Sequence, residues 1–347
     1  FDQPVTISIF SICSFSIANE QSKWKNDLTP IALSDWNAKA AAHLLDRAGF
    51  GGTPEDVVKL AKMSHKDAVS YLVNYKNIPN QLKPFEPSGI YEPGFENFPS
   101  SRPAATDMAK KTGESLGVKV KPSGNRRLQQ VADKYLYWLR ASMLETQRIS
   151  YWWANRMLQT NRPLEEKMTL FWHGHFATTE DKVRDYRKML KQNELFRQKA
   201  TGNYRDLLIA TAKDPAMLAF LDAAVNVKGA PNENFAREIM ELFTMGVGNY
   251  TEKDIQEAAR AFTGWNYKNL SFVKIANQHD SDSKVVLGKT GNFDGEQVID
   301  IILSKEATSE YMASKLYRYF VREDVSPELK KKLGALLKKS NYEIAPF

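Results

Sequence analysis

Two histidines separated by one glycine, His173 and His175, are the residues of this sequence best suited to metal chemistry. The chain holds only five histidines in 347 residues, and Phe171, Trp172 and Phe176 enclose this pair. A His-x-His pair in a loop can present two neutral imidazoles to one ion, because the glycine relaxes the backbone between them. The spacing therefore predicts His173 and His175 as ligands of a divalent metal such as zinc, iron or manganese.

Two carboxylates on a second segment are suited to complete such a site. Glu238 and Glu241 are three residues apart, and a helix would place both on one face. We expect Glu238 and Glu241 to be metal ligands or a catalytic base, and Arg237 to orient an anionic group. Such a site retains open positions for water, which favours hydrolysis, with oxidoreductase chemistry as the other reaction class.

Further polar residues could join this site. His279 and Asp280 are adjacent in the chain and are candidates for an additional ligand or general base. Glu166 is a weaker candidate, since it lies about two helical turns before His173 if the helix persists that far.

Structural roles are an alternative for the same residues. His173 and His175 are also suited to the C-terminus of a helix, where the dipole favours a protonated imidazole. Arg237 can pair along its own helix with Glu233 or Glu241, which would leave no carboxylate for a metal. A metal or catalytic centre, a structural polar network and a ligand-binding groove without chemistry therefore all stay open.

Two helices must position these side chains. Pro163 suits a first helical turn, and Leu164 and Met168 begin an apolar stripe that continues toward the histidines. The second helix opens at Asn232 and closes at Gly246. We expect the candidate site to lie between these two helices.

The remaining pattern predicts a mainly α fold in a single domain over residues 31–347. Strong helical periodicity returns after residue 126, and alternation around an Asp/Ser-rich turn predicts one small β-hairpin in residues 271–295. Residues 79–125 are rich in proline and glycine and form a long irregular segment, either a linker or a loop that crosses a functional face.

Composition limits the classes of function. The formal charge of +7 is spread among nearly as many acids, so we do not expect nucleic-acid binding. No apolar stretch is long enough for a membrane-spanning helix, and the single cysteine, Cys13, excludes an internal disulfide framework. Residues 6–18 are apolar and are followed by a polar segment, so residues 1–30 are expected to be an export-type or extended segment. This favours a periplasmic, cell-surface or extracellular protein.

Six segments make the chain resemble the bacterial DUF1800 family. They are His43–Gly51, Phe171–Phe176, Asn232–Glu238, Glu241–Val247, Ala261–Trp265 and Gln278–Asp280. The resemblance implies a mostly helical, commonly exported protein of no established function, with a DUF1501-family protein as a partner. The family usually has histidine where this chain has Phe243, so a site that needs that imidazole would be altered here. Two hypotheses follow: a metal-dependent hydrolase or oxidoreductase, and a non-catalytic cell-surface binding or assembly protein that recognises a saccharide or protein.

Overall fold

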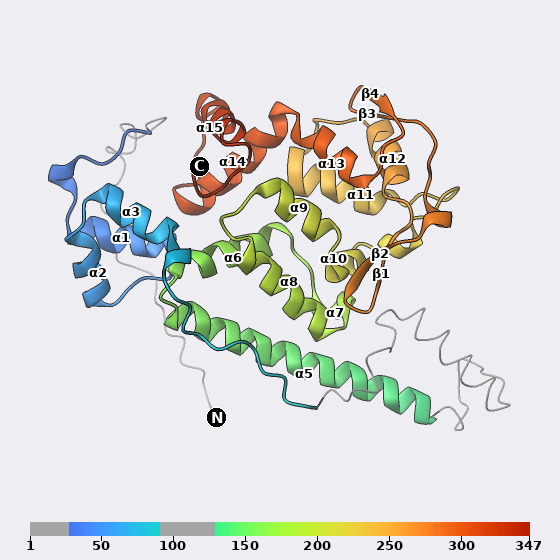
Figure 1. Cartoon of the computed structure of the whole chain (residues 1–347), viewed down its shortest axis with the longest axis horizontal. Helices are drawn as coiled ribbons and strands as arrows, with labels where there is room; N and C mark the ends of the chain where they lie inside the picture. The colour runs from blue at the N-terminus through green and yellow to red at the C-terminus, as the bar shows by residue number, and fades with distance from the viewer. Residues whose placement is uncertain (1–27, 91–128) are drawn as a thin grey trace, which may run out of the picture.

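The computed structural model describes residues 28–90 and 129–347 (Figure 1). The described chain is mainly α-helical, which confirms the predicted fold class. The predictions for residues 1–30 and 79–125 fall largely outside the described residues. The elements that matter below are α1 (Ala38–Ala48), α2 (Pro54–Ala61), α3 (His65–Val73), α5 (Gln129–Gln159), α6 (Pro163–His175), α7 (Glu180–Val183), α8 (Tyr186–Gln198), α9 (Tyr204–Ala212), α10 (Pro215–Phe220), α11 (Glu233–Met240), the π-helix η7 (Glu241–Met245), α12 (Glu252–Ala261), β1 (Trp265–Lys268), β2 (Ser271–Lys274), β3 (Lys284–Val286), β4 (Lys289–Gly291), α13 (Gly295–Leu303), α14 (Glu306–Phe320) and α15 (Pro327–Lys339).

In residues 28–90 and 129–347 the β-strands form two short antiparallel hairpins, where one was predicted. β1 pairs with β2 in the register Trp265 to Lys274, and β3 pairs with β4 in the register Lys284 to Gly291. The first hairpin therefore begins six residues before the predicted range. In the second, Leu287 and the following glycine both have positive φ, at 50° and 81°, which is the backbone that a two-residue hairpin loop needs.

The two helices predicted to carry the site are present. Pro163 occupies the first turn of α6, as expected from its fixed φ and missing N–H. Asn232 caps α11 through its side chain, and the segment closes at Gly246, where φ is +77°. A Cβ at Gly246 would lie 2.9 Å from the ring of Tyr311 on α14, so glycine is required there for both backbone and space.

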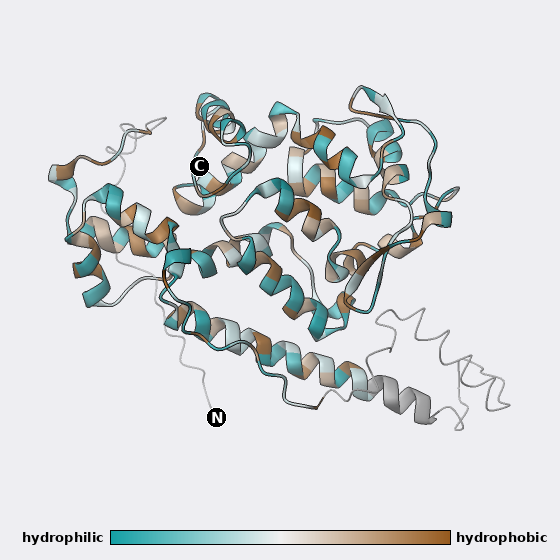
Figure 2. Ribbon diagram, viewed as in Figure 1, coloured by the Kyte–Doolittle hydropathy of each residue, from teal (hydrophilic) through white to brown (hydrophobic). Residues whose placement is uncertain are grey.

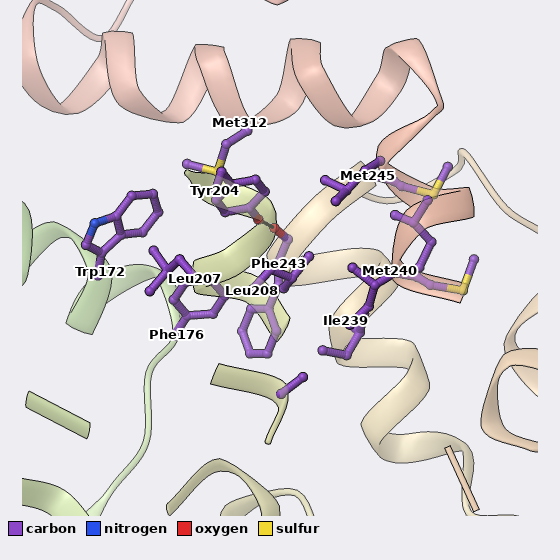
Figure 3. Packing of buried hydrophobic residues seen from close by; sticks show 14 of the residues in the cluster. Trp172, Phe176, Tyr204, Leu207, Leu208, Ile239, Met240, Phe243, Met245 and Met312 are labelled. Carbon is purple, nitrogen blue, oxygen red and sulfur yellow. Dashed lines mark hydrogen bonds between the residues drawn. The ribbon is translucent and has the colours of Figure 1, made fainter. Parts of the chain in front are cut away.

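The main hydrophobic core joins these two helices (Figure 3). Trp172 and Phe176 are fully buried, and the ring of Trp172 stacks on that of Tyr204 from α9, with centroids 5.8 Å apart. Phe243 from the π-helix packs edge-on against Phe176 at 5.1 Å. The aromatic residues around the two histidines are therefore core residues, which explains their spacing without a cofactor.

Helices α1 to α3 form a group at one end of the molecule (Figure 1). Arg47 on α1 attaches this group to the body, since its guanidinium donates to the backbone oxygens of Tyr319 and Phe320 at the end of α14, at 2.6 and 2.7 Å. A cation in this place also complements the negative end of the helix dipole. The segment around Arg47, one of those that carry the family resemblance, therefore has a structural role.

The long helix α5 runs along the lower edge of the molecule in the view of Figure 1, with the segment before residue 91 beside it. The indole of Trp152 donates to the oxygen of Lys83 at 3.1 Å, and Arg148 donates to the oxygen of Glu86 at 3.0 Å. Within the described ranges, no helix is both long and apolar enough to cross a membrane.

Candidate functional site

His175 is fully engaged by two neighbouring elements. Its Nε2 lies 3.0 Å from the backbone oxygen of Phe243, and its Nδ1 lies 3.2 Å from Nζ of Lys315 on α14. Because a carbonyl can only accept, Nε2 carries the proton and Nδ1 accepts from the lysine. Burial, and then the charge of Lys315, hold the pKa of His175 well below its usual range, against the opposing effect of the Phe243 carbonyl. The imidazole is therefore neutral, with both nitrogens in use.

His173 faces a different neighbour, α8. The amide nitrogen of Asn193 lies 3.0 Å from Nε2 of His173, while the amide oxygen accepts from Arg197 at 2.6 Å. The asparagine therefore donates to His173, whose Nε2 lone pair is occupied. Burial and the charge of Arg197 lower the pKa of His173 to about 3, and its ring packs on that of Trp153 at 4.6 Å.

The expected two-histidine clamp is not formed in this structure. The prediction placed the pair in a loop, but α6 continues through His175. Residues two apart on a helix lie about 200° apart around its axis. His173 and His175 therefore point to opposite sides, one to α8 and the other to the π-helix. Neither ring bonds a carbonyl of its own helix end among the described contacts, so the capping alternative is not formed either.

Glu166 is a structural anchor rather than a metal ligand. Its fully buried carboxylate accepts from Arg156 at 3.0 Å, from Arg197 at 2.8 and 3.1 Å, and from the indole of Trp153 at 3.0 Å. These donors come from α5 and α8. Glu166 thus joins three helices by charge-assisted hydrogen bonds in a dry interior.

The π-helix η7 is the point where the two predicted segments meet. A π-helix is rare, and its wider turn leaves carbonyls that need other donors; such segments are frequent at functional sites. The oxygen of Phe243 accepts from His175 and from the hydroxyl of Tyr204, and the oxygen of Leu242 accepts from Tyr311 at 3.1 Å and Lys315 at 3.2 Å. Side chains of α6, α9 and α14 thus hold the irregular turn in place.

The two predicted carboxylates lie at the entry to this π-helix. Glu241 is its first residue and accepts a short hydrogen bond from the hydroxyl of Tyr250. Glu238 lies one turn earlier, half-buried, and no group in the described ranges donates a hydrogen bond to its carboxylate. Burial, and then the charge of Glu241, raise the pKa of Glu238. The pair therefore combines a carboxylate that accepts a hydrogen bond from Tyr250 with one, Glu238, that retains its proton more readily.

Three further polar side chains, those of Tyr311, Lys315 and Tyr250, donate hydrogen bonds to the π-helix. Burial, and then the charge of Glu241, raise the pKa of Tyr311, so its hydroxyl stays protonated. Burial lowers the pKa of Lys315, whose ammonium lies 4.9 Å from the ring centroid of Tyr311. Burial and the bond to Glu241 raise the pKa of Tyr250 to about 12. Sequence reasoning missed all three, because they come from distant segments and no local pattern connects them with Glu241.

Arg237 is occupied by ion pairs on its own side of the helix. It donates to Glu233 at 3.1 Å, as the structural alternative predicted, and to Glu252 at 2.6 and 2.9 Å. The predicted partner Glu241 bonds Tyr250 instead. Arg237 thus links α11 to α12.

His279 and Asp280 form a separate structural centre. The carboxylate of Asp280 accepts from Arg260 at 2.7 and 3.3 Å, and Nδ1 of His279 lies 2.9 Å from the backbone oxygen of Thr263. The nearby Gly264 has φ +76° and would clash with the oxygen of Ile275 if it carried a Cβ. These contacts fix the loop between the two hairpins to the end of α12, and none of them reaches Glu238, Glu241 or either histidine of α6.

A second cluster of ionisable groups, which the sequence did not reveal, lies between α7, α8 and α10. Burial raises the pKa of Glu180 and of Asp214 to about 7, and burial lowers that of Lys188 to about 8. Asp214 caps α10 and accepts from Gln192 at 2.8 Å. The sequence indicates that Asp214 caps a helix, because it stands directly before a proline. Its burial, and therefore its raised pKa, depends on tertiary packing and could not be predicted.

The metal expectation gains no support from these positions. Among the described residues there is no group of three or more His, Cys, Asp or Glu side chains arranged to hold a metal ion. The structure does bring His175 to the same segment as Glu238 and Glu241, through the backbone of the π-helix rather than through a shared ion.

Comparison with known proteins identifies a family but no characterised relative. A family model described as "Protein of unknown function (DUF1800)" matches residues 43–347. Neither the curated proteins nor the solved structures contain a match to this chain.

Proposed function

The chain belongs to the DUF1800 family, and we propose that it is a hydrolase that uses Glu238 and Glu241 as an acid–base pair. One observation carries the proposal: two adjacent carboxylates differ in environment, Glu241 being hydrogen-bonded by Tyr250 while Glu238 has a raised pKa. Neighbouring titratable groups in different surroundings, one of them with a raised pKa, are characteristic of acid–base sites. Their place beside a π-helix held by four side chains adds the rigidity that such a site needs.

The roles follow from the two environments. Glu241 accepts a proton from a water molecule, whose oxygen forms the new bond to the electrophilic atom of the substrate. Glu238 gives its proton to the leaving group as the old bond breaks, so charge and protons balance, and solvent restores both carboxyl groups. Lys315 lies beside Tyr311 and uses two of its three N–H donors on His175 and the oxygen of Leu242; the third would stabilise negative charge that develops on the substrate.

His175 acts in this proposal as a positioning residue. Its bond to the Phe243 carbonyl and its acceptance from Lys315 connect the π-helix with α14. The family's usual histidine at position 243 is absent, yet the contact made here uses the backbone oxygen of that residue. The phenylalanine therefore leaves this contact intact.

A panel of ester, glycoside, phosphoester and peptide substrates tests the proposal. We expect hydrolysis of at least one class by the wild-type chain, and a loss of about 10²- to 10⁴-fold in Glu238→Gln and in Glu241→Gln, the range for removal of a general acid or base. Glu55→Gln, on the exposed first turn of α2, is the control that retains activity. Turnover by Glu238→Gln at the wild-type rate would refute the assignment. Absence of hydrolysis across the panel would favour the non-catalytic alternative.

We also propose that the chain functions outside the cytoplasm. The support is the apolar run at residues 6–18 and its polar continuation. Fractionation of producing cells tests this, and recovery of the protein entirely in the cytoplasm would contradict it.

A further inference from the structure

The outer face of α5 carries a stripe of exposed apolar side chains at heptad spacing. Leu144, Tyr151 and Leu158 are seven residues apart and are 47%, 73% and 79% exposed. Tyr137, one heptad earlier, is 44% exposed, although its hydroxyl bonds the oxygen of Ile90. No other α-helix in the described chain carries more than one exposed large apolar residue. Figure 2 shows apolar bands recurring along α5 at the edge of the molecule.

This stripe is not needed for the packing of α5 on its own molecule. The buried residues of α5, such as Trp138, Ala141 and Ile149, lie on a different face and pack in a separate small core. The helix therefore has a second apolar face that nothing in the described chain covers. Exposed apolar surface of this kind marks interaction sites.

The spacing selects a helix as the occupant. Side chains seven apart drift by only about 20° per heptad around a straight helix, so a second helix can follow them with a slight left-handed crossing. From Leu144 to Leu158 the stripe is about 21 Å long, at 1.5 Å per residue. A partner of roughly three or four turns would cover it.

The charged residues along the stripe indicate which charge the partner helix should carry. Between positions 137 and 158, α5 exposes Arg140 and Arg148; Arg148 forms an ion pair with the buried Glu145, so Arg140 is the exposed cation of this face whose charge no described carboxylate offsets. A second copy of α5 would add a second Arg140 to this face and no exposed carboxylate. A helix with acidic flanks would find complementary charge.

A shallow groove lies directly beside the stripe. It has a volume of about 360 Å³ and is lined by Tyr151, Trp152 and Arg148 of α5 and by the segment 83–86. This segment contributes the exposed cation of Lys83 and one carboxylate, Glu86. The groove offers a recess for a large side chain of the partner, as in helix-in-groove recognition.

We propose that the outer face of α5 binds an amphipathic helix of a protein partner, whose apolar heptad positions are flanked by acidic residues. The face is distinct from the carboxylate pair of the π-helix, and its occupation requires no change there.

Two designed helical peptides test this proposal with the full chain. Both carry leucine at heptad positions; one has glutamate flanks and the other lysine flanks, and each is labelled for fluorescence anisotropy at concentrations where it is monomeric. We expect the glutamate peptide to bind the wild-type chain, and Tyr151→Gln/Leu158→Gln to weaken it at least tenfold. Leu336→Gln on α15 removes an exposed leucine from another face and is expected to leave binding unchanged. Arg140→Gln is expected to weaken binding and its salt dependence.

Three results would overturn the proposal. They are equal binding of the lysine-flanked peptide, equal loss of binding in Leu336→Gln, and failure of the glutamate peptide to bind at all. Light scattering tests a second copy of the chain as the occupant. If the wild-type chain is a dimer and the Tyr151→Gln/Leu158→Gln variant is a monomer, the face binds a second copy and the proposal is likewise overturned. Circular dichroism of each variant, compared with wild type, shows that the fold is retained.

Discussion

Replacement of Glu166 by glutamine should destabilise the fold severely. The carboxylate is fully buried, and its charge is matched against two buried guanidinium groups, those of Arg156 and Arg197. Glu166→Gln keeps the side-chain volume but leaves both guanidinium groups without an anion in a low-dielectric interior. Removal of one partner of a buried ion pair costs about 3–5 kcal/mol of folding free energy. Urea unfolding followed by circular dichroism measures this loss as a lowered midpoint with unchanged slope.

A matched substitution gives the control. Glu252 pairs with Arg237 by similar distances, 2.6 and 2.9 Å, but its side chain is 68% exposed. Exposed ion pairs contribute about 0–1 kcal/mol, so Glu252→Gln should be close to neutral. If Glu166→Gln costs no more than Glu252→Gln, the inference that Glu166 anchors α5, α6 and α8 is wrong.

Three further predictions concern pH, backbone and metal. Since burial raises the pKa of Asp214 to about 7 in the fold, the contribution of Asp214 to stability should be greatest at acid pH and should fall as pH rises from about 4 through 7. Asp214→Asn keeps the helix cap and removes this contribution, so the two chains should differ in the slope of melting temperature against pH between pH 4 and 8; identical slopes would contradict the burial argument. Gly246→Ala places a Cβ 2.9 Å from the ring of Tyr311 at a residue with φ +77°, so it should lower the free energy of unfolding by about 1–3 kcal/mol in the same urea assay. An unchanged free energy of unfolding would contradict the close contact. Exhaustive dialysis against a chelator should leave the melting temperature unchanged, because Nε2 of His173 and both ring nitrogens of His175 contact protein groups. If the melting temperature drops by several degrees and added zinc, iron or manganese restores it, the two histidines bind a metal after all.

Much of the fold was predictable because it rests on local patterns. Pro163 and Asn232 mark helix starts through backbone chemistry that operates within one turn. The first hairpin was missed at its beginning, because Trp265 is buried and reads equally well as the end of the preceding helix. The alternation that predicts strands is weak in segments of three or four residues.

The site was predictable in its parts but not in its geometry. The two segments around His175 and Glu241 do meet, as their pairing predicted. The sequence could not show that α6 continues through His175, which turns His173 to the other side. Nor could it show the π-helix, because a one-residue change of hydrogen-bond register leaves no compositional mark. Lys315 reaches the site only through the packing of α14, which is a tertiary effect.

The protonation of Glu238 tests the central claim most directly. Carbon-13 carboxyl NMR of the full chain can follow Glu238 across pH 3 to 9 in wild type and in Glu241→Gln. The acid–base pair predicts that Glu238 titrates above its ordinary value of 4.5 in the wild-type chain, and that Glu241→Gln, which removes the neighbouring charge, moves this pKa down. A Glu238 that titrates at or below 4.5, or that does not respond to Glu241→Gln, would show that the two carboxylates are not coupled and would contradict the proposed function.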